Sequence, residues 1–324
     1  MEFLQDYGLF FAKTITLVLA LLLVATALAG IGSRSRGGSR ARLETKKLNR
    51  QYDEYQQTLE RSLLERKAAR RLHKQRAKER KQNKLEQRVF VLDFNGDIRA
   101  SQVDNLREEI SAILTVANND DEVVVRLQSG GGMVPNYGLA AAELARLKGR
   151  VKLTIMIDRI AASGGYLMAC VGDRIYASPF AIIGSIGVIA QLPNFHRLLK
   201  RHHVDMELLT AGDHKRTLTL FGENTEQGRQ KLQEELEETH QLFKDYIRRF
   251  RPSLAIERIA TGEYWLGERA LELGLIDALQ TSDDYLLELS SRAQLLHLRY
   301  LRRQSLGRRV SLSLETAIRE WRGY

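Results

Sequence analysis

Ser163 lies where an apolar, β-branched run ends in the sequence AASGGY, residues 161–166. A segment with helical character follows, so the serine is expected at a sharp strand-to-helix turn with its hydroxyl exposed. The amides of Gly164 and Gly165 would then lie at a helix N-terminus, where donors lack partners and negative charge is favoured. These are the parts of a nucleophile beside an anion-stabilising pocket. An ordinary turn with a serine N-cap has the same pattern, so this stretch alone does not decide.

A second glycine-rich stretch, residues 130–132, follows another apolar run. It lacks the Lys-Ser/Thr pair of a P-loop, and no G-x-G-x-x-G pattern follows, so a phosphate site is not indicated. Consecutive glycines instead indicate a close approach of the backbone to a ligand, or a turn with positive φ. One exposed amide of this loop, together with the Gly164 amide, would make a two-donor oxyanion hole.

A nucleophilic serine needs a base, and the candidates are His196, His202, His203, His214 and Lys215. A Ser/His/Asp triad stays open, since Asp158 and Asp173 are available as its acid. Lysine can serve if it is neutral, which burial among apolar groups and nearby cations favour. Lys215 follows an apolar run and lies between two basic neighbours, which suits that role. Without Ser163, the same pattern would indicate a solvated lysine in a turn.

Metal and cofactor chemistry is not indicated by the residues available. The chain has one cysteine, Cys170, and seven scattered histidines without the spacing of metal ligands. The adjacent pair His202 and His203 would point apart on a helix or a strand. We therefore expect no metal and no cofactor. A single cysteine also excludes an intrachain disulfide.

The net charge of +10 is concentrated in one segment. Residues 33–88 hold 19 Lys or Arg and 7 Asp or Glu, so the rest of the chain is near neutral. Residues 42–87 contain no Gly or Pro and predict one long, solvated helix. Such a segment suits attraction to anionic lipid head groups, or a charged spacer. Nucleic-acid binding is not expected, because no aromatic platform accompanies the charge.

Residues 14–32 form an uncharged run of 19 residues, long enough to cross a hydrocarbon core of roughly 30 Å as a helix. Sequences of the A-x-A type in this run also fit a cleaved signal peptide. The segment before the run is not positively charged, however, so a retained single-pass anchor is predicted. The basic residues after the anchor place the remaining chain on the cytoplasmic side by the positive-inside rule.

The rest of the chain alternates short apolar runs with segments of helical periodicity. Strands are predicted at residues 89–94, 122–127, 151–157, 173–178, 182–191 and 205–211. Helices are predicted at residues 101–117, 134–147, 167–171, 225–251, 267–275 and 283–296. The alternation indicates βαβ units and an α/β fold with a mostly parallel sheet. Sites in such sheets lie at the carboxyl ends of strands, where the glycine loop and Ser163 both fall.

Three motifs carry a resemblance to a known family: AASGGY at residues 161–166, ASPFAIIGSIGV at 177–188 and TAGDHKRTLTLFGENTEQGR at 210–229. In this order and spacing they resemble the signal peptide peptidase A family of serine peptidases. The resemblance is dense over residues 89–284, and the anchor and charged helix resemble the N-terminal extension of one membrane-bound group within the family. It implies a ClpP/crotonase-like fold and a Ser-Lys dyad.

By this resemblance, Ser163 matches the family nucleophile and Lys215, 52 residues later, matches the general base. Ser185 matches a serine that hydrogen-bonds to that lysine and orients it. A dyad also bears on residues 175–195, which carry no charge. If that run crossed a membrane, the serine and the lysine would lie on opposite sides of it, so we expect the run to be protein core.

The glycine loop resembles a family S-P-G-G turn. The resemblance makes Gly132 the expected oxyanion donor alongside Gly164, with Gly131 next to it in the same hole. Gly130 stands where the family usually has proline. A rigid φ is lost there, so the loop is expected to be less preorganised.

Four segments are therefore expected: a membrane anchor at residues 1–32, a basic helical linker at 33–88, a peptidase domain at 89–284 and a basic amphipathic tail at 285–324. The predicted function is a serine endopeptidase anchored in the bacterial inner membrane. Its substrates would be peptides or proteins, membrane-associated or similar to signal peptides, and its linker would contact membrane lipid.

The family further implies a homo-oligomeric ring or dome, in which the serine and lysine of one site come from neighbouring protomers. Relatives are associated with the outer face of the inner membrane, against the positive-inside rule, so the side of the membrane stays open. Two other functions remain: a catalytically inactive, membrane-tethered scaffold that binds peptides, and a crotonase-type acyl-CoA enzyme. The Ser-Lys pair argues against the second.

Overall fold

The computed structural model describes residues 8–22, 42–82, 85–212, 215 and 217–302. Residues 43–300 form one compact unit, and the two ends of the chain, residues 1–42 and 301–324, form another. The larger unit contains the residues of the predicted site.

The larger unit is built on a mostly parallel sheet, which confirms the predicted α/β class. Its main strands follow the order β1-β10-β2-β3-β4-β6-β9, and β5, β7 and β8 branch from it. The strands are β1 (Arg42–Lys47), β2 (Arg88–Gly96), β3 (Glu122–Ser129), β4 (Lys152–Ile157), β5 (Ile160–Ala162), β6 (Arg174–Ala177), β7 (Ile182–Gly184), β8 (Tyr264–Leu266), β9 (Ala278–Leu279) and β10 (Gln294–Leu301). The pairs from β10 through β9 are parallel, and β7 pairs antiparallel with β8.

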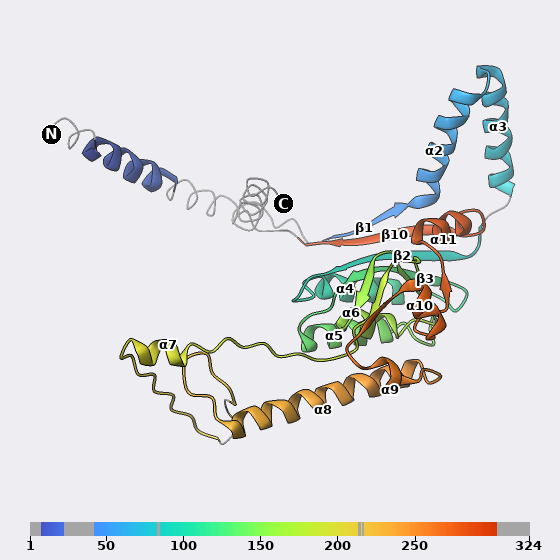
Figure 1. Cartoon of the computed structure of the whole chain (residues 1–324). Helices are drawn as coiled ribbons and strands as arrows, with labels where there is room; N and C mark the ends of the chain where they lie inside the picture. Colours follow the sequence, from blue (N-terminus) through green and yellow to red (C-terminus); the bar gives the residue numbers. More distant parts are fainter. Residues whose placement is uncertain (1–7, 23–41, 83–84, 213–214, 216, 303–324) are drawn as a thin grey trace. The chain divides into compact units, whose positions relative to one another are not determined.

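Helices pack on both faces of this sheet (Figure 1). The helices of this unit are α2 (Leu48–Leu63), α3 (Arg66–Gln82), α4 (Val103–Leu114), α5 (Val134–Ala145), α6 (Gly164–Ala169), α7 (His196–Arg201), α8 (Glu226–Phe250), α9 (Ile256–Ile259), α10 (Gly267–Glu272) and α11 (Ser282–Leu289). The predicted helices around residues 101–117, 134–147, 225–251 and 267–275 are confirmed. The side-chain oxygen of Thr225 accepts a hydrogen bond from the Gly228 amide and so caps α8.

The two faces of the sheet carry separate apolar cores. On one face, Phe90 and Leu92 of β2 pack with side chains of α4, α5 and α6. On the other face, Val89 and Val91 pack with Leu48 of α2 and with α11. A strand that is buried on both faces is apolar at successive positions, which is why residues 89–94 are apolar in the sequence except for Asp93.

The single long helix predicted for residues 42–87 is wrong. The segment begins with β1, and its helical part is divided into α2 and α3 by a break in which Leu64 has extended backbone. Asn49 attaches the start of α2 to the sheet. Its Nδ2 donates to the carbonyls of Ser290 (2.9 Å) and Ala293 (2.8 Å), and its Oδ1 accepts from the Leu295 amide (2.8 Å). These three hydrogen bonds pair backbone groups next to β10. A helical pattern in the sequence does not indicate that Asn49 makes them.

The helix predicted for residues 283–296 ends at Leu289, and β10 follows. Leu295 is buried in one core and Leu298 in the other, so their spacing of three, which suits a helix, arises here from a strand with two covered faces. Because β10 pairs with β2 inside the sheet, residues 294–300 belong to the globular unit rather than to a separate tail. Residues 303–324 of the predicted tail lie outside the described residues.

Two further strand predictions are wrong. Residues 205–211 form no strand, and β7 ends at Gly184, so residues 185–191 continue without strand structure. An apolar run forms a strand only when it can pair with a sheet edge, and from Ile189 onward most of the large apolar side chains of this segment are exposed instead. The buried residues Ile175, Ile183 and Ile186 nonetheless place the first half of residues 175–195 in the protein core, as predicted.

The predicted anchor is described only in part. Residues 8–22 form a helix, and residues 23–32 lie outside the described residues. Within the part of the chain that the structure describes, no helix is long and apolar enough to cross a membrane.

Asp93 of β2 contributes an ion pair whose loss should be measurable. Its carboxylate lies 2.6 and 2.9 Å from Nε and Nη2 of Arg126, and 2.9 Å from Nε2 of His297. Burial raises the pKa of Asp93, but the hydrogen bonds from His297 and Arg126 outweigh burial and lower the pKa to about 2. Asp93→Asn leaves the Arg126 charge half-buried without its partner, so we expect the free energy of unfolding at pH 7 to fall by about 2 kcal/mol.

Because the folded pKa lies below the unfolded value of 3.8, the contribution of Asp93 is present above about pH 4 and is lost as the pH falls toward 2. In urea unfolding, the free energies of unfolding of wild type and Asp93→Asn should therefore converge as the pH falls from about 4 toward 2. The control is Asp120→Asn, which changes an exposed carboxylate. If the free energies of unfolding of wild type and Asp93→Asn differed by the same amount at all pH values, the assignment would be contradicted.

Candidate active site

Ser163 lies in a strained turn between β5 and α6. Its φ and ψ are 52° and −121°, a region that non-glycine residues rarely occupy. The turn is held because the Ser163 amide donates to the Gly184 carbonyl of the neighbouring strand (2.8 Å). The predicted strand-to-helix elbow is therefore present, and α6 begins directly after the serine. Strained backbone of this kind is common at functional sites.

Ser185 lies beside Ser163 because of strand register. Ala162 of β5 pairs with Gly184 of β7, so the next residue on each strand is a serine. Ser185 also has positive φ, 51°, and its amide donates to the Glu263 carbonyl (2.6 Å). Both serines line one cavity of about 470 Å³.

The glycine loop closes one side of this cavity, and all three of its glycines line it. Gly131 has φ of 85°, and a methyl group built on it would lie 2.6 Å from the Gly164 nitrogen and 2.8 Å from the Ser163 Cβ. A methyl group on Gly132 would overlap the Ile98 carbonyl. The loop and the elbow are thus in contact, backbone against backbone, which only glycine permits.

The amides around the elbow differ in whether they are engaged. The Gly131 amide donates to Oγ of Ser129 (3.1 Å). The amides of Gly132 and Gly164 donate to no other described residue. The Gly164 amide also opens α6, where the helix dipole favours negative charge. Gly132 and Gly164 are therefore the amides available to a developing oxyanion, whereas the amide of Gly131 is engaged within the loop.

The opposite wall of the cavity is apolar. It is formed by side chains from α5, α6, α8 and the segment after β7, namely Val134, Leu167, Val188, Ile189, Leu242, Phe243 and Tyr246. Burial raises the pKa of Tyr246 to about 12. This wall suits an extended peptide with apolar side chains.

Lys215 is not among the residues that line the cavity. It is exposed, and its amide donates to the Gly212 carbonyl (3.2 Å). It belongs to a segment that, with α7, lies beside the start of α8 and away from the sheet (Figure 1). Within one chain the structure therefore brings Ser163, Ser185 and the glycines together, but not Lys215.

The alternative triad residues do not gather around Ser163 either. His196, His202 and His203 lie on or after α7, none lines the cavity, and His214 lies outside the described residues. Asp158 accepts hydrogen bonds from the amide and hydroxyl of Ser282 (2.8 and 2.5 Å). Asp173 pairs with Lys148 and accepts from the Leu153 amide. Both aspartates thus have structural partners.

The segment that carries Lys215 is rich in exposed apolar side chains. Those between residues 189 and 221 that are at least two-fifths exposed are Ile189, Leu192, Phe195, Leu198, Val204, Met206, Leu208, Leu209 and Phe221. Leu209 is 92% exposed and Ile189 is 87% exposed. An apolar surface of this extent is typical of a protein–protein contact.

A metal site has no structural basis in the part of the chain described: no group of three or more His, Cys, Asp or Glu side chains there could hold an ion. Cys170 is fully buried and its thiol donates to the Leu167 carbonyl (3.2 Å). Burial raises the pKa of this thiol, so it is not a nucleophile.

The structure adds two residues that the sequence analysis missed, Ser129 and Tyr137. Tyr137 of α5 is fully buried, and its ring lies against Gly164. On the sequence it is one apolar position of an amphipathic helix, so no pattern distinguishes it from ordinary core.

Gly131→Ala is expected to lower kcat for peptide hydrolysis by about 10²- to 10³-fold, the usual effect of losing an oxyanion donor. The added methyl group would fill the space in front of the Gly164 amide, and alanine is strained at this φ. The measurement is steady-state cleavage of a fluorogenic peptide, with thermal unfolding to show that the variant is folded. Gly149→Ala is the control: it imposes the same φ strain at 74°, where the methyl group meets open space. Similar activity losses in both variants would contradict the assignment.

Two family models match successive parts of this chain. Residues 2–144 match the family model Peptidase family S49 N-terminal, and residues 145–296 match Peptidase family S49. The chain is 47% identical to a Haemophilus influenzae protein named "Probable protease SohB", over 94% of this chain and 91% of the relative. It is 45% identical to the protein of the same name from Buchnera aphidicola subsp. Schlechtendalia chinensis, over 89% and 99%.

Among solved structures, a mutant of the 1510-N membrane-bound stomatin-specific protease in complex with a substrate peptide is similar over 70% of this chain and 97% of that one. The TM-score is 0.45 and the identity 14%.

Proposed function

The chain belongs to peptidase family S49 and is a peptidase of the SohB type, and from this premise we propose that it is a membrane-anchored serine endopeptidase with a Ser163–Lys215 dyad. One observation carries the proposal: a serine on a strained elbow lies beside two amides without partners among the described residues, in a cavity with an apolar wall. We also propose that the α/β sheet is of the ClpP/crotonase-like form.

In the proposed reaction, the Ser163 hydroxyl attacks the peptide carbonyl while Lys215, neutral, accepts its proton. The carbonyl oxygen becomes an oxyanion that the amides of Gly132 and Gly164 stabilise. Collapse breaks the C–N bond, and Lys215 returns the proton to the leaving amine. Water, deprotonated by the same lysine, then hydrolyses the acyl-enzyme and restores the serine. Ser185, next to Ser163 in register, is proposed to accept a hydrogen bond from the lysine and orient it.

We propose that Lys215 enters this cavity from a neighbouring protomer of a homo-oligomer. Two observations support this: Lys215 does not line the cavity of its own chain, and the segment around it exposes an apolar surface. Burial of that surface against a second copy would remove Lys215 from water and favour its neutral form. The absence of Lys215 from the cavity also favours the second candidate, a peptide-binding scaffold without activity.

A fluorophosphonate probe separates the two candidates. In the full chain extracted from membranes as an oligomer, the probe should label Ser163, identified by mass spectrometry of the labelled peptide. Lys215→Ala should abolish labelling, whereas Lys200→Ala, which changes an exposed lysine of the same segment, should not. An assembled oligomer without labelling at Ser163 would support the scaffold and refute the peptidase proposal.

We propose that residues 14–32 anchor the chain in the inner membrane, that the basic linker contacts anionic lipid, and that membrane-associated or signal-peptide-like proteins are the substrates. By the positive-inside rule, the charge after the anchor favours the cytoplasmic side for the peptidase domain. Protease added outside right-side-out vesicles should then leave the domain intact, and the same protease should digest it in inverted vesicles. Digestion from the outside would refute this orientation.

A further inference from the structure

We propose that Tyr137 is a positioning residue that holds both amides of the oxyanion hole in place. Its hydroxyl acts on the glycine loop through the hydroxyl of Ser129, and its ring contacts Gly164. This inference rests on the proposed peptidase function. Tyr137 and Ser129 are 0% and 1% exposed, and neither contributes to the reaction steps described above.

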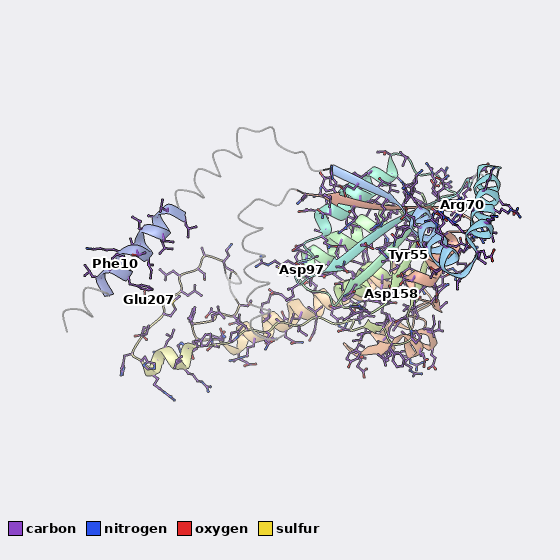
Figure 2. The ribbon with its side chains drawn as sticks, turned by 90° about the horizontal axis from the view of Figure 1, so that it is seen from above. Phe10, Tyr55, Arg70, Asp97, Asp158 and Glu207 are labelled. Carbon is purple, nitrogen blue, oxygen red and sulfur yellow. The ribbon has the colours of Figure 1, made fainter. Side chains whose placement is uncertain are left out.

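The hydrogen bonds between these residues run in one direction. The Tyr137 hydroxyl donates to the carbonyl of Asp97 (2.7 Å). Asp97, which is labelled in Figure 2, directly follows β2. The only proton of the Tyr137 hydroxyl is therefore used, so the Ser129 hydroxyl must donate to it across their 2.6 Å contact. The Ser129 oxygen then accepts from the Gly131 amide (3.1 Å). A single chain of bonds thus links the glycine loop to the end of β2.

This chain fixes the residue next to the oxyanion donor. With its amide bonded to Ser129, Gly131 can rotate little, and the peptide that carries the Gly132 amide follows it directly. The backbone of the next residue is also held, since the Met133 amide donates to the Ile98 carbonyl (2.8 Å). The Gly132 amide is therefore fixed from both sides while remaining free to bind an anion.

The ring of the same tyrosine contacts the other donor. A methyl group built on Gly164 would overlap Cγ, Cβ and Cδ1 of Tyr137, so the ring lies directly against the Gly164 Cα. The Gly164 amide is the second proposed donor and is attached to that Cα. One buried side chain thus sets the separation of two amides that follow different strands, β3 and β5.

The hydroxyl of Tyr137 is the part of this arrangement that packing does not require. Phenylalanine would fill the same space, and burial of a hydroxyl is costly unless it is hydrogen-bonded. Its two bonds go to the backbone after β2 and to the serine that holds Gly131. We therefore expect its removal to affect the stabilisation of the transition state more than the binding of the substrate.

The test compares Tyr137→Phe, Ser129→Ala and the double variant in the full-length oligomer. Each single variant is expected to lower kcat for a fluorogenic peptide about tenfold, with KM changed less than about twofold, because a loosened donor weakens only transition-state binding. The double variant should be no worse than either single variant, since both changes break the same chain. Tyr55→Phe, an exposed tyrosine on α2 (Figure 2), is the matched control.

A second readout does not depend on activity. Amide hydrogen exchange of Gly131, followed by NMR or in a peptide covering residues 130–133, should be at least about tenfold faster in Tyr137→Phe than in wild type, because the amide loses a fixed acceptor. Unchanged exchange, multiplicative effects in the double variant, or a rise in KM at constant kcat would overturn the inference. Wild type that neither cleaves peptide nor reacts with the fluorophosphonate would refute the proposed function, and the exchange result would still decide the role of Tyr137.

Discussion

Ser163→Ala is expected to lower kcat/KM for peptide hydrolysis by about 10⁴-fold or more, because a covalent mechanism cannot begin without its nucleophile. The residual rate should come from the oxyanion amides and from substrate binding alone. This substitution removes no hydrogen bond that holds the turn. The Ser163 amide, rather than its hydroxyl, holds the turn, by donating to Gly184 (2.8 Å), and the side-chain oxygen makes no hydrogen bond with another described residue.

The measurement is cleavage of a quenched-fluorescence peptide by the purified oligomer, with size-exclusion chromatography and thermal unfolding for both proteins. Ser291→Ala is the matched control, since it removes an exposed hydroxyl whose one hydrogen bond to another described residue is to the Glu288 carbonyl. The Ser163→Ala protein should keep its assembly and its melting temperature. Activity that survives the substitution would show that another group attacks the peptide, and equal losses in both variants would point to a general loss of folding.

Much of the globular fold could be predicted because its strands are buried on both faces. The runs at residues 89–94 and 122–127 are apolar apart from Asp93, Glu122 and Arg126, since β2 and β3 lie between two cores. β10 escaped prediction for a related reason: Leu295 and Leu298 enter different cores, and their spacing matches a helix turn as well as a strand. Local pattern cannot say which faces of an element will be covered.

The half of the site that depends on local backbone was also predictable. A serine and two glycines at a strand end fix the elbow and place the Gly164 amide beside the serine. The register of β5 with β7 then brings Ser185 alongside. Tyr137 could not be found in this way, because its role depends on the Asp97 carbonyl, 40 residues earlier in the chain. For Lys215 the sequence predicts the role but not the position. Its motif is specific in the sequence, yet the folded single chain does not place it in the cavity.

Mixed oligomers of Ser163→Ala and Lys215→Ala subunits are expected to recover activity that neither variant has alone. Each variant by itself should lose about 10⁴-fold in kcat/KM. If every site takes its serine from one protomer and its lysine from the next, a random 1:1 mixture in a ring leaves about a quarter of the sites with both residues intact. If both residues come from one chain, no site is intact. The two arrangements therefore differ by about 2,500-fold in activity.

The exchange of subunits must occur before the measurement, because preformed oligomers that do not mix would give no recovery in either case. Co-expression of the two variants with different affinity tags, followed by purification through both tags, isolates oligomers that contain both. The control is a doubly substituted Ser163→Ala/Lys215→Ala subunit co-assembled with Lys215→Ala, which has no intact lysine and should stay inactive. Recovery near a quarter of wild type would also explain why the apolar segment around Leu209 is exposed in the single chain, since the contact that buries it would be the contact that completes the site. Inactive mixed oligomers would instead require Lys215 to reach Ser163 within its own chain by a rearrangement of residues 190–224.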